Sequence, residues 1–145
     1  GEFYVTPGGE VGSIGVWQAH FDYSKALEDE GVKPTLISAG KFKVEGNPYV
    51  PLDLEALSFM QSRVDDYYNA FAKAVAKGRG LTVNDVREGM GEGRVLGADA
   101  ALAAKMVDGV ATFDEVLAKM QKTARSAQPV GASRLKQARA ALALI

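Results

Sequence analysis

The feature that most constrains the fold is one long amphipathic segment between Asp53 and Gly80. Asp53 is a suitable N-cap, and glycines at positions 78 and 80 end the pattern. Charged residues such as Arg63 and Lys73 fall mostly off the apolar face. We therefore expect a long helix packed on a sheet or a partner. Its apolar residues recur at helical intervals: Leu54, Leu57, Val64, Tyr68, Phe71 and Val75.

Shorter elements are predicted before this helix. Residues 3–6 are aromatic and β-branched and stop at Pro7-Gly8-Gly9, which predicts a strand followed by a turn. Residues 13–17 predict a second extended stretch, residues 25–29 a short helix, and residues 34–38 a buried strand. Strand, helix and strand in this order predict a right-handed βαβ crossover in a mainly parallel sheet.

The rest of the chain alternates loops and short elements. Residues 40–52 contain two prolines and two glycines and predict a loop long enough to carry a site. Downstream we expect helices over 83–90 and 98–106, a strand over 94–96, and a helix from Phe113 towards Lys122. Residues 123–131 have the composition of a linker, and residues 132–145 that of a helical tail.

Composition excludes several classes of function. The 145 residues, 47% hydrophobic and 24% charged, suit one soluble globular domain. A net charge of -1 gives no electrostatic case for binding nucleic acid or an anionic membrane. Without cysteine, and with His20 as the single histidine, the chain lacks the ligands of a usual zinc site and the histidines of a metal cluster. We expect no cofactor, no metal and no membrane-spanning segment.

Considered one at a time, most candidate motifs have an ordinary structural interpretation. Gly12-Ser13-Ile14-Gly15 lacks the strand-turn-helix context of a nucleophile elbow and is assigned to a strand. Lys41 and Lys43 read as solvated surface charges, and His20 has no acid or nucleophile beside it in the sequence. Asp65 and Asp66 are consecutive on a helix, where their side chains point to different faces, so they do not form a catalytic dyad.

Taken together, a series of motifs changes this assessment. The series is Tyr4-Val5-Thr6-Pro7, Gly12-Ser13-Ile14-Gly15-Val16, Asp22-Tyr23-Ser24, Ser38-Ala39-Gly40-Lys41-Phe42-Lys43, Asn47-Pro48-Tyr49, Arg79-Gly80-Leu81, Gly93-Arg94-Val95-Leu96-Gly97, Ala100 and Val107-Asp108. In this order the motifs resemble the signal peptide peptidase A family and its phage relatives, the capsid-maturation proteases. The resemblance spans residues 3–120 and implies a ClpP/crotonase-like α/β fold, with residues 1–122 as the C-terminal part of a Ser-Lys peptidase domain.

The resemblance also implies a site. In that family a serine attacks the scissile carbonyl and a lysine is the general base. The lysine ends the pattern Gly-x-x-Lys, which is Gly40-Lys41-Phe42-Lys43 in this sequence, so Lys43 is the expected base. A free lysine has a pKa near 10.4, so it accepts a proton at neutral pH only where burial or a neighbouring cation lowers that pKa. A second serine of the family orients the lysine amine, and Ser13 matches it.

One departure from the family pattern decides what this chain can do alone. In the family the nucleophilic serine and the oxyanion-hole glycine stand upstream of the Tyr-Val-Thr-Pro segment, and both would precede Gly1. We therefore expect a fragment of a serine endopeptidase, inactive unless another polypeptide supplies the nucleophile. Expected partners are a peptide or protein substrate, further copies of the chain packed through the long helix, and an N-terminal companion fragment.

Two alternatives remain open at the level of sequence. A crotonase-like acyl-CoA enzyme would keep the fold but use other oxyanion donors and would not need the Lys43 motif. A structural or scaffold-associated capsid module would use the tail after Pro129 to bind its partner. No membrane anchor is evident in the sequence, which favours the bacterial cytoplasm or a phage prohead.

Overall fold

Four short strands form two separate two-stranded sheets in the computed structural model, which describes residues 1–126. Strand β1 (Tyr4–Val5) pairs in parallel with β4 (Gly109–Val110). Strand β2 (Glu10–Gly12) pairs in an antiparallel ladder with β3 (Val95–Gly97). One parallel and one antiparallel pair are thus present, so the mainly parallel sheet expected from the sequence is not found among the described residues.

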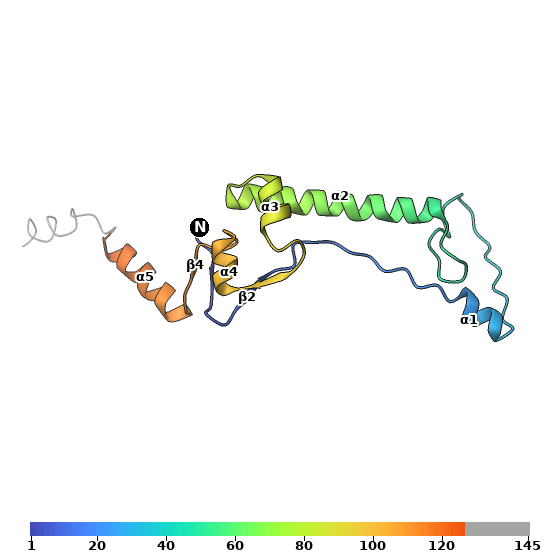
Figure 1. Ribbon diagram of the computed structural model, residues 1–145, viewed down its shortest axis with the longest axis horizontal. Coiled ribbons are helices and arrows are strands. Elements are labelled where there is room, and N and C mark those ends of the chain that lie inside the picture. Colours follow the sequence, from blue (N-terminus) through green and yellow to red (C-terminus); the bar gives the residue numbers. More distant parts are fainter. Residues whose placement is uncertain (127–145) are drawn as a thin grey trace, which may run out of the picture.

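The described part of the chain is a mixed α/β structure, in agreement with the general class predicted. Helix α4 contacts strands of both sheets, and the long helix α2 packs against α3 above them (Figure 1). The five described helices are α1 (Ser24–Asp29), α2 (Leu54–Arg79), α3 (Val83–Gly89), α4 (Ala98–Ala103) and α5 (Phe113–Ser126).

Both ends of α2 are formed as the sequence predicts. The Asp53 side chain accepts a hydrogen bond of 2.7 Å from the backbone N–H of Ala56, which satisfies one of the free donors of the first turn. At the other end Gly80 adopts a left-handed conformation with φ of 66°, which costs a glycine little. Short-range chemistry therefore fixes both boundaries of the helix.

The apolar face predicted for α2 is only partly correct. Its buried residues are Ala56, Ala72 and Ala76, whereas Leu54 is 84% exposed and Leu57 is also exposed. Only the C-terminal half of the helix lies over the sheets and α3, and the N-terminal half extends beyond them (Figure 1). The apolar periodicity was therefore a correct guide to the helix and a poor guide to which residues the core buries.

The core lies where the second half of α2 meets α3, α4 and the strands. Val86 and Met90 are each 1% exposed, and Ala72 and Ala101 are fully buried. A capping box fixes the start of α3, because the side chains of Thr82 and Asp85 each bond the other's backbone N–H. The complete buried cluster is Val5, Ile14, Ala72, Ala76, Val86, Met90, Ala98, Ala101, Met106 and Val107.

Two predicted strands are wrong in the described structure. The second strand covers Glu10–Gly12 and ends before Ser13, so residues 13–17 lie outside it. Residues 34–38 form no strand, and Ile37 is 93% exposed. A strand needs a neighbour to accept its hydrogen bonds, and no described segment pairs with residues 34–38. The predicted βαβ crossover is consequently absent from residues 1–126.

The last described helix starts where the sequence predicts but runs further, because residues 123–126, assigned to a linker from their composition, are helical and belong to α5. Thr112 and Glu115 form reciprocal hydrogen bonds at the start of α5, which continues to Ser126. Lys119 of this helix bonds both carboxylate oxygens of Glu2, at 2.8 and 3.0 Å, and its ammonium also contacts Tyr4. The predicted tail over residues 132–145, and most of the predicted linker before it, lie outside the described residues.

Candidate active site

Ser13 stands directly after β2, at the point where the ladder with β3 ends. Its backbone N–H donates to the carbonyl of Arg94 at 2.9 Å, and its φ of 58° is in the left-handed region. The preceding Gly12 lies so close to Arg94 that a Cβ there would be 2.3 Å from the Arg94 carbonyl oxygen. A glycine is therefore required before Ser13 by close backbone approach, and Ser13 is held in a defined but exposed position.

Lys43 lies in the loop before α2, within consecutive tight turns. The backbone N–H of Lys43 donates to Gly40, that of Glu45 to Phe42, and that of Asn47 to Val44, at 3.1 to 3.2 Å. The Lys43 side chain is exposed, and its amine has no hydrogen bond or ion pair within residues 1–126. The turns thus fix the backbone that carries the lysine, while no described residue removes its amine from water.

Asn47 organises this loop, a role that the sequence alone did not reveal. Its side-chain amide donates to the carbonyl of Val44 at 2.7 Å and accepts from the N–H of Tyr49 at 2.9 Å. Nε2 of His20 lies 3.1 Å from the Asn47 carbonyl and must donate, because a carbonyl oxygen only accepts. The pattern Asn-Pro, typical of a turn start, was the available indication of this role.

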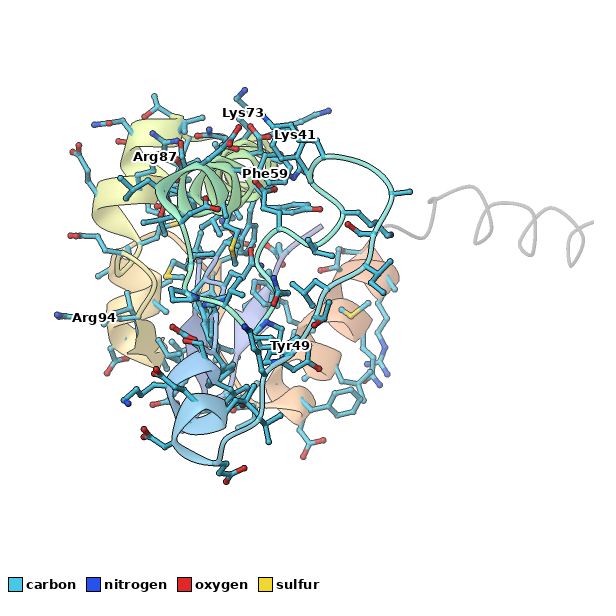
Figure 2. All side chains as sticks on the ribbon, turned by 90° about the vertical axis from the view of Figure 1, so that its right-hand side faces the viewer. Lys41, Tyr49, Phe59, Lys73, Arg87 and Arg94 are labelled. Carbon is cyan, nitrogen blue, oxygen red and sulfur yellow. The ribbon has the colours of Figure 1, made fainter. Side chains whose placement is uncertain are left out.

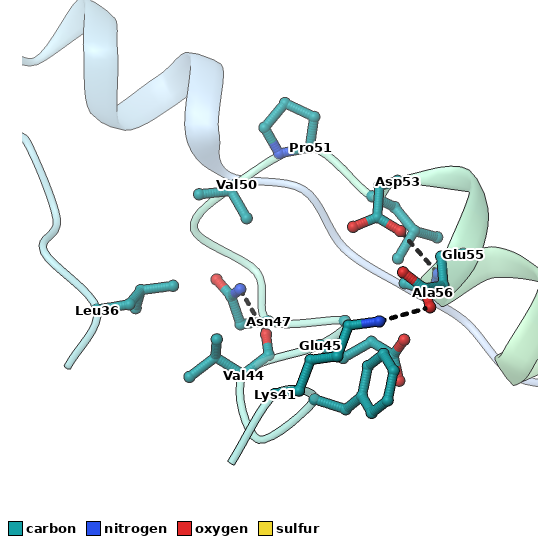
Figure 3. A pocket seen from close by; sticks show the side chains of 13 residues that line it. Leu36, Lys41, Val44, Glu45, Asn47, Val50, Pro51, Asp53, Glu55 and Ala56 are labelled. Atoms are coloured by element: carbon teal, nitrogen blue, oxygen red, sulfur yellow. Dashed lines mark hydrogen bonds and ion pairs between the residues drawn. The ribbon is translucent and has the colours of Figure 1, made fainter. Parts of the chain in front are cut away.

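The loop of residues 40–52, which we call the Lys43 loop, contacts two other segments. Lys41 forms an ion pair of 3.3 Å with Glu55 in the first turn of α2, and the N–H of Tyr23 donates to the carbonyl of Pro48 at 2.8 Å. Lys41 and Glu55 also line a pocket of about 210 Å³, together with apolar residues such as Leu36 and Val44 (Figure 3). The loop is therefore a structured element with a recess, as expected for a segment that carries a site.

The described structure does not bring Ser13 and Lys43 together. The Lys43 loop lies at the N-terminal end of α2, whereas β2 and the start of the segment after it lie beside the second half of that helix (Figure 1). No hydrogen bond in the described part of the chain connects the two residues. The expected orientation of the lysine amine by Ser13 therefore stays a prediction.

Arg79 and Asp108, which belong to two of the sequence motifs, form a structural clamp. The Arg79 guanidinium donates two hydrogen bonds to the Asp108 carboxylate, at 2.8 and 3.1 Å, and a third to the carbonyl of Lys105. Asp108 also accepts from the N–H of Phe3 at 2.6 Å. Arg79 and, second, the Phe3 amide lower the pKa of Asp108 to about 2. The clamp joins the end of α2 to β1 and β4.

Other candidate groups carry no site. Asp65 accepts from Gln61 and Asp66 pairs with Arg63, so the two carboxylates have separate partners, as their helical positions imply. Within residues 1–126 no three potential ligands among His, Cys, Asp and Glu are grouped to hold a metal ion. No described helix has the length and apolar character needed to cross a membrane.

The comparisons with known proteins define the class. The family model of Peptidase family S49 matches residues 1–127, and the chain belongs to this family. It is 37% identical over 117 residues to the capsid assembly protease C of Escherichia phage lambda, which covers 81% of this chain and 26% of that protein. It is 42% identical over 82 residues to the head-tail preconnector protein GP5 of Enterobacteria phage P21, covering 57% of this chain and 16% of that protein.

A bacterial relative extends the comparison beyond phages. The chain is 28% identical over 131 residues to a protein of Enterococcus faecium provisionally named as the signal peptide peptidase SppA, with 84% of this chain and 38% of that protein covered. The family membership predicted from the motifs is therefore confirmed. The chain spans between about a sixth and two fifths of the length of these relatives, 16% to 38%.

Proposed function

We propose that this chain is part of a serine endopeptidase that hydrolyses peptide bonds with a Ser-Lys dyad, in which Lys43 is the general base. Membership in Peptidase family S49 supports the peptidase class. The observation that carries the choice of base is the position of Lys43, which ends the Gly-x-x-Lys pattern on a loop held by its own turns and by Asn47. Ser13 is proposed to orient the lysine amine.

The proposed chemistry proceeds through an acyl-enzyme. A serine hydroxyl from outside this chain attacks the carbonyl carbon, and the neutral Lys43 amine takes the proton and passes it to the departing amine. Water then attacks the ester by the same route and regenerates the serine. The exposure of Lys43 in this chain is consistent with a base that further polypeptide must cover, since desolvation is what keeps a lysine amine neutral.

We further propose that the intact peptidase has the ClpP/crotonase-like fold, with residues 1–122 as the C-terminal part of its peptidase domain. The parallel pairing of β1 with β4, whose strands lie near the two ends of this stretch, supports that assignment. The exposed apolar side chains along residues 16–60, such as Trp17 and Leu54, support contacts with further copies of the chain or with a companion segment.

The decisive experiment compares Lys43→Met with Lys33→Met in the complete peptidase. Lys33 is an exposed lysine of the same region and serves as the matched control. Loss of the base should lower the turnover of a fluorogenic peptide by about 10⁴-fold or more without changing thermal stability, whereas Lys33→Met should keep full activity. Ser13→Ala should lower turnover by roughly a hundredfold, as for loss of one orienting hydrogen bond.

Two outcomes would count against the proposal. Undiminished turnover in Lys43→Met would remove Lys43 from the mechanism. Turnover by the pure chain alone, abolished by Lys43→Ala, would show that the nucleophile lies within residues 1–145 after all.

A structural role in capsid assembly is the second candidate. The relative named as a head-tail preconnector protein, together with the exposed apolar residues of the 16–60 segment, favours it. A serine-directed fluorophosphonate separates the two: covalent labelling of the complete protein supports the peptidase, and its absence supports the structural role.

A further inference from the structure

A second cleft lies next to the Lys43 loop and has no role in the mechanism described above. It has a volume of about 570 Å³, within the range of pockets that bind small ligands or long side chains. Two of its lining residues are the aromatic Phe42 and Phe59, which are 51% and 55% exposed. The lining residues are Phe42, Glu45, Glu55, Ser58, Phe59 and Ser62.

The backbone explains why these side chains converge. The N–H of Glu45 donates to the carbonyl of Phe42, so one turn links these two residues, and both line the cleft. On α2, Glu55, Phe59 and Ser62 recur at intervals of four and three and share one helical face. Lys43 belongs to the same turn as Phe42 and Glu45. The proposed base and the cleft are thus built on one short stretch of backbone.

Figure 2 looks along α2 and places this face on one side of the helix. Phe59 and Lys41 lie there, whereas Arg87 lies on the other side. The nearby cation is therefore Lys41, whose amine lies 4.4 Å from the centre of the Phe42 ring and 3.3 Å from Glu55. The Lys41 ammonium group therefore already lies between the Phe42 ring and the Glu55 carboxylate at the rim of the cleft.

The charges at the cleft are unbalanced. Its lining holds the two carboxylates Glu45 and Glu55, and Lys41 neutralises one of them. Glu45 forms no ion pair within residues 1–126. Covering Glu45 with a purely apolar group would leave its carboxylate desolvated without a partner, and an acidic group would repel it. A cation on a long aliphatic stem satisfies both the aromatic walls and the carboxylate.

We propose that this cleft binds a lysine or arginine side chain of a peptide ligand, with the stem between Phe42 and Phe59 and the charged head at Glu45. The assignment of that peptide as the substrate rests on the proposed function. Binding of the peptide does not depend on it, because the cleft is formed by residues of this chain alone.

The test is a titration of the full chain with fluorescein-labelled pentapeptides that carry arginine, norleucine or glutamate at the central position. The arginine peptide should bind about tenfold more tightly than the norleucine peptide, as expected for one desolvated cation–π and carboxylate contact. Glu45→Gln should reduce this ratio to below about threefold. Lys41→Met should increase affinity for the arginine peptide several-fold, because it leaves Glu55 available to the ligand.

Matched controls separate this site from a general effect of net charge. Glu88→Gln and Lys122→Met make the same two charge changes on α3 and α5, at exposed positions, and should leave the arginine preference unchanged. An unchanged preference in Glu45→Gln, or equal shifts in Glu88→Gln, would overturn the proposal. Thermal melting of each variant verifies that it is folded.

Failure of the cleft can be distinguished from failure of the proposed function. Lys43→Met should retain the arginine preference in binding while it abolishes hydrolysis by the complete peptidase. If hydrolysis depends on Lys43 and the peptides bind without discrimination, only the cleft assignment is wrong. If the preference holds and Lys43 is dispensable for hydrolysis, the cleft stands as a peptide site and the proposed base is wrong.

Discussion

The two halves of α2 lie in different surroundings: the C-terminal half packs in the core, and the N-terminal half lies beside the segment that carries the proposed base. Around its C-terminal half, α3, α4 and the strands form the buried cluster that contains Met90 and Ala101. Around its N-terminal half, residues 16–60 form what we call the arm, in which Ala56 is the one buried residue. Turns, caps and ion pairs fix the local structure of the arm. It carries Lys43, the first pocket and, apart from Ser62, the residues that line the second cleft.

The two regions are therefore stabilised in different ways, one by burial and the other by local hydrogen bonds and ion pairs. In the core, burial of apolar groups stabilises the arrangement directly. In the arm, large apolar side chains remain exposed, as Trp17 and Ile37 show at 84% and 93%. Such exposed apolar side chains fit the contacts with further polypeptide that we propose. We therefore expect substitutions in the core to lower the stability of the isolated chain. Substitutions in the arm should instead affect function.

The largest stability effect is expected for Met90→Ala. Met90 is 1% exposed at the end of α3, and truncating a buried methionine removes transfer free energy and leaves a cavity. The free energy of unfolding should fall by about 2–5 kcal/mol in a urea titration. Met120→Ala is the control, because Met120 is 64% exposed on α5 and should change stability by less than about 0.5 kcal/mol. Equal effects at both positions would contradict the description of the core.

A smaller, pH-dependent effect is expected at the clamp. The folded-state pKa of Asp108 is about 2, against an ordinary value of 3.8, because Arg79 and the Phe3 amide stabilise the carboxylate. A lowered pKa favours the folded state above pH 4, and this contribution disappears as the pH falls from about 4 to about 2. Asp108→Asn should therefore destabilise the chain at pH 6 and flatten the loss of stability over that acid range.

Asp66→Asn is the matched control for the clamp. Asp66 pairs with Arg63 by a single contact, and its side chain is 67% exposed, against 34% for Asp108. Exposed pairs contribute little to stability, so this variant should follow the unmodified chain at every pH. Thermal midpoints measured from pH 2 to pH 6 test both variants. A steep acid transition that persists in Asp108→Asn would assign it to other carboxylates.

Local elements were predictable from sequence because their causes are local. The N-cap at Asp53, the capping box of Thr82 with Asp85, and the left-handed Gly80 each depend on residues within a few positions of one another. The turn after β1 belongs to the same class, since Gly9 N–H bonds the carbonyl of Thr6 within a single turn. The family was predictable because several motifs occur together in a fixed order.

Pairing and burial could not be predicted in the same way, because they depend on which distant segments meet. Residues 34–38 have the composition of a strand, yet no described neighbour pairs with them. Leu54 fits the apolar periodicity of α2, but it lies at the N-terminal end of the helix, outside the core, and is exposed. Lys43 was located from the family pattern, whereas the joint placement of Phe42, Glu45 and Phe59 required coordinates.

The smallest stability effects are expected in the arm, and they test the comparison most directly. Trp17→Ala and Ile37→Ala remove large side chains that are mostly in water, so the free energy of unfolding of the chain should change by less than about 0.5 kcal/mol. A loss comparable to that of Met90→Ala would show that the arm is packed in solution. In the complete peptidase the same substitutions should weaken assembly, as sedimentation would detect, because covering an exposed aromatic or aliphatic side chain stabilises a contact by roughly 1.5–3 kcal/mol. If these substitutions leave the stability of the chain unchanged but weaken the assembly, the exposed side chains of the arm contact another polypeptide.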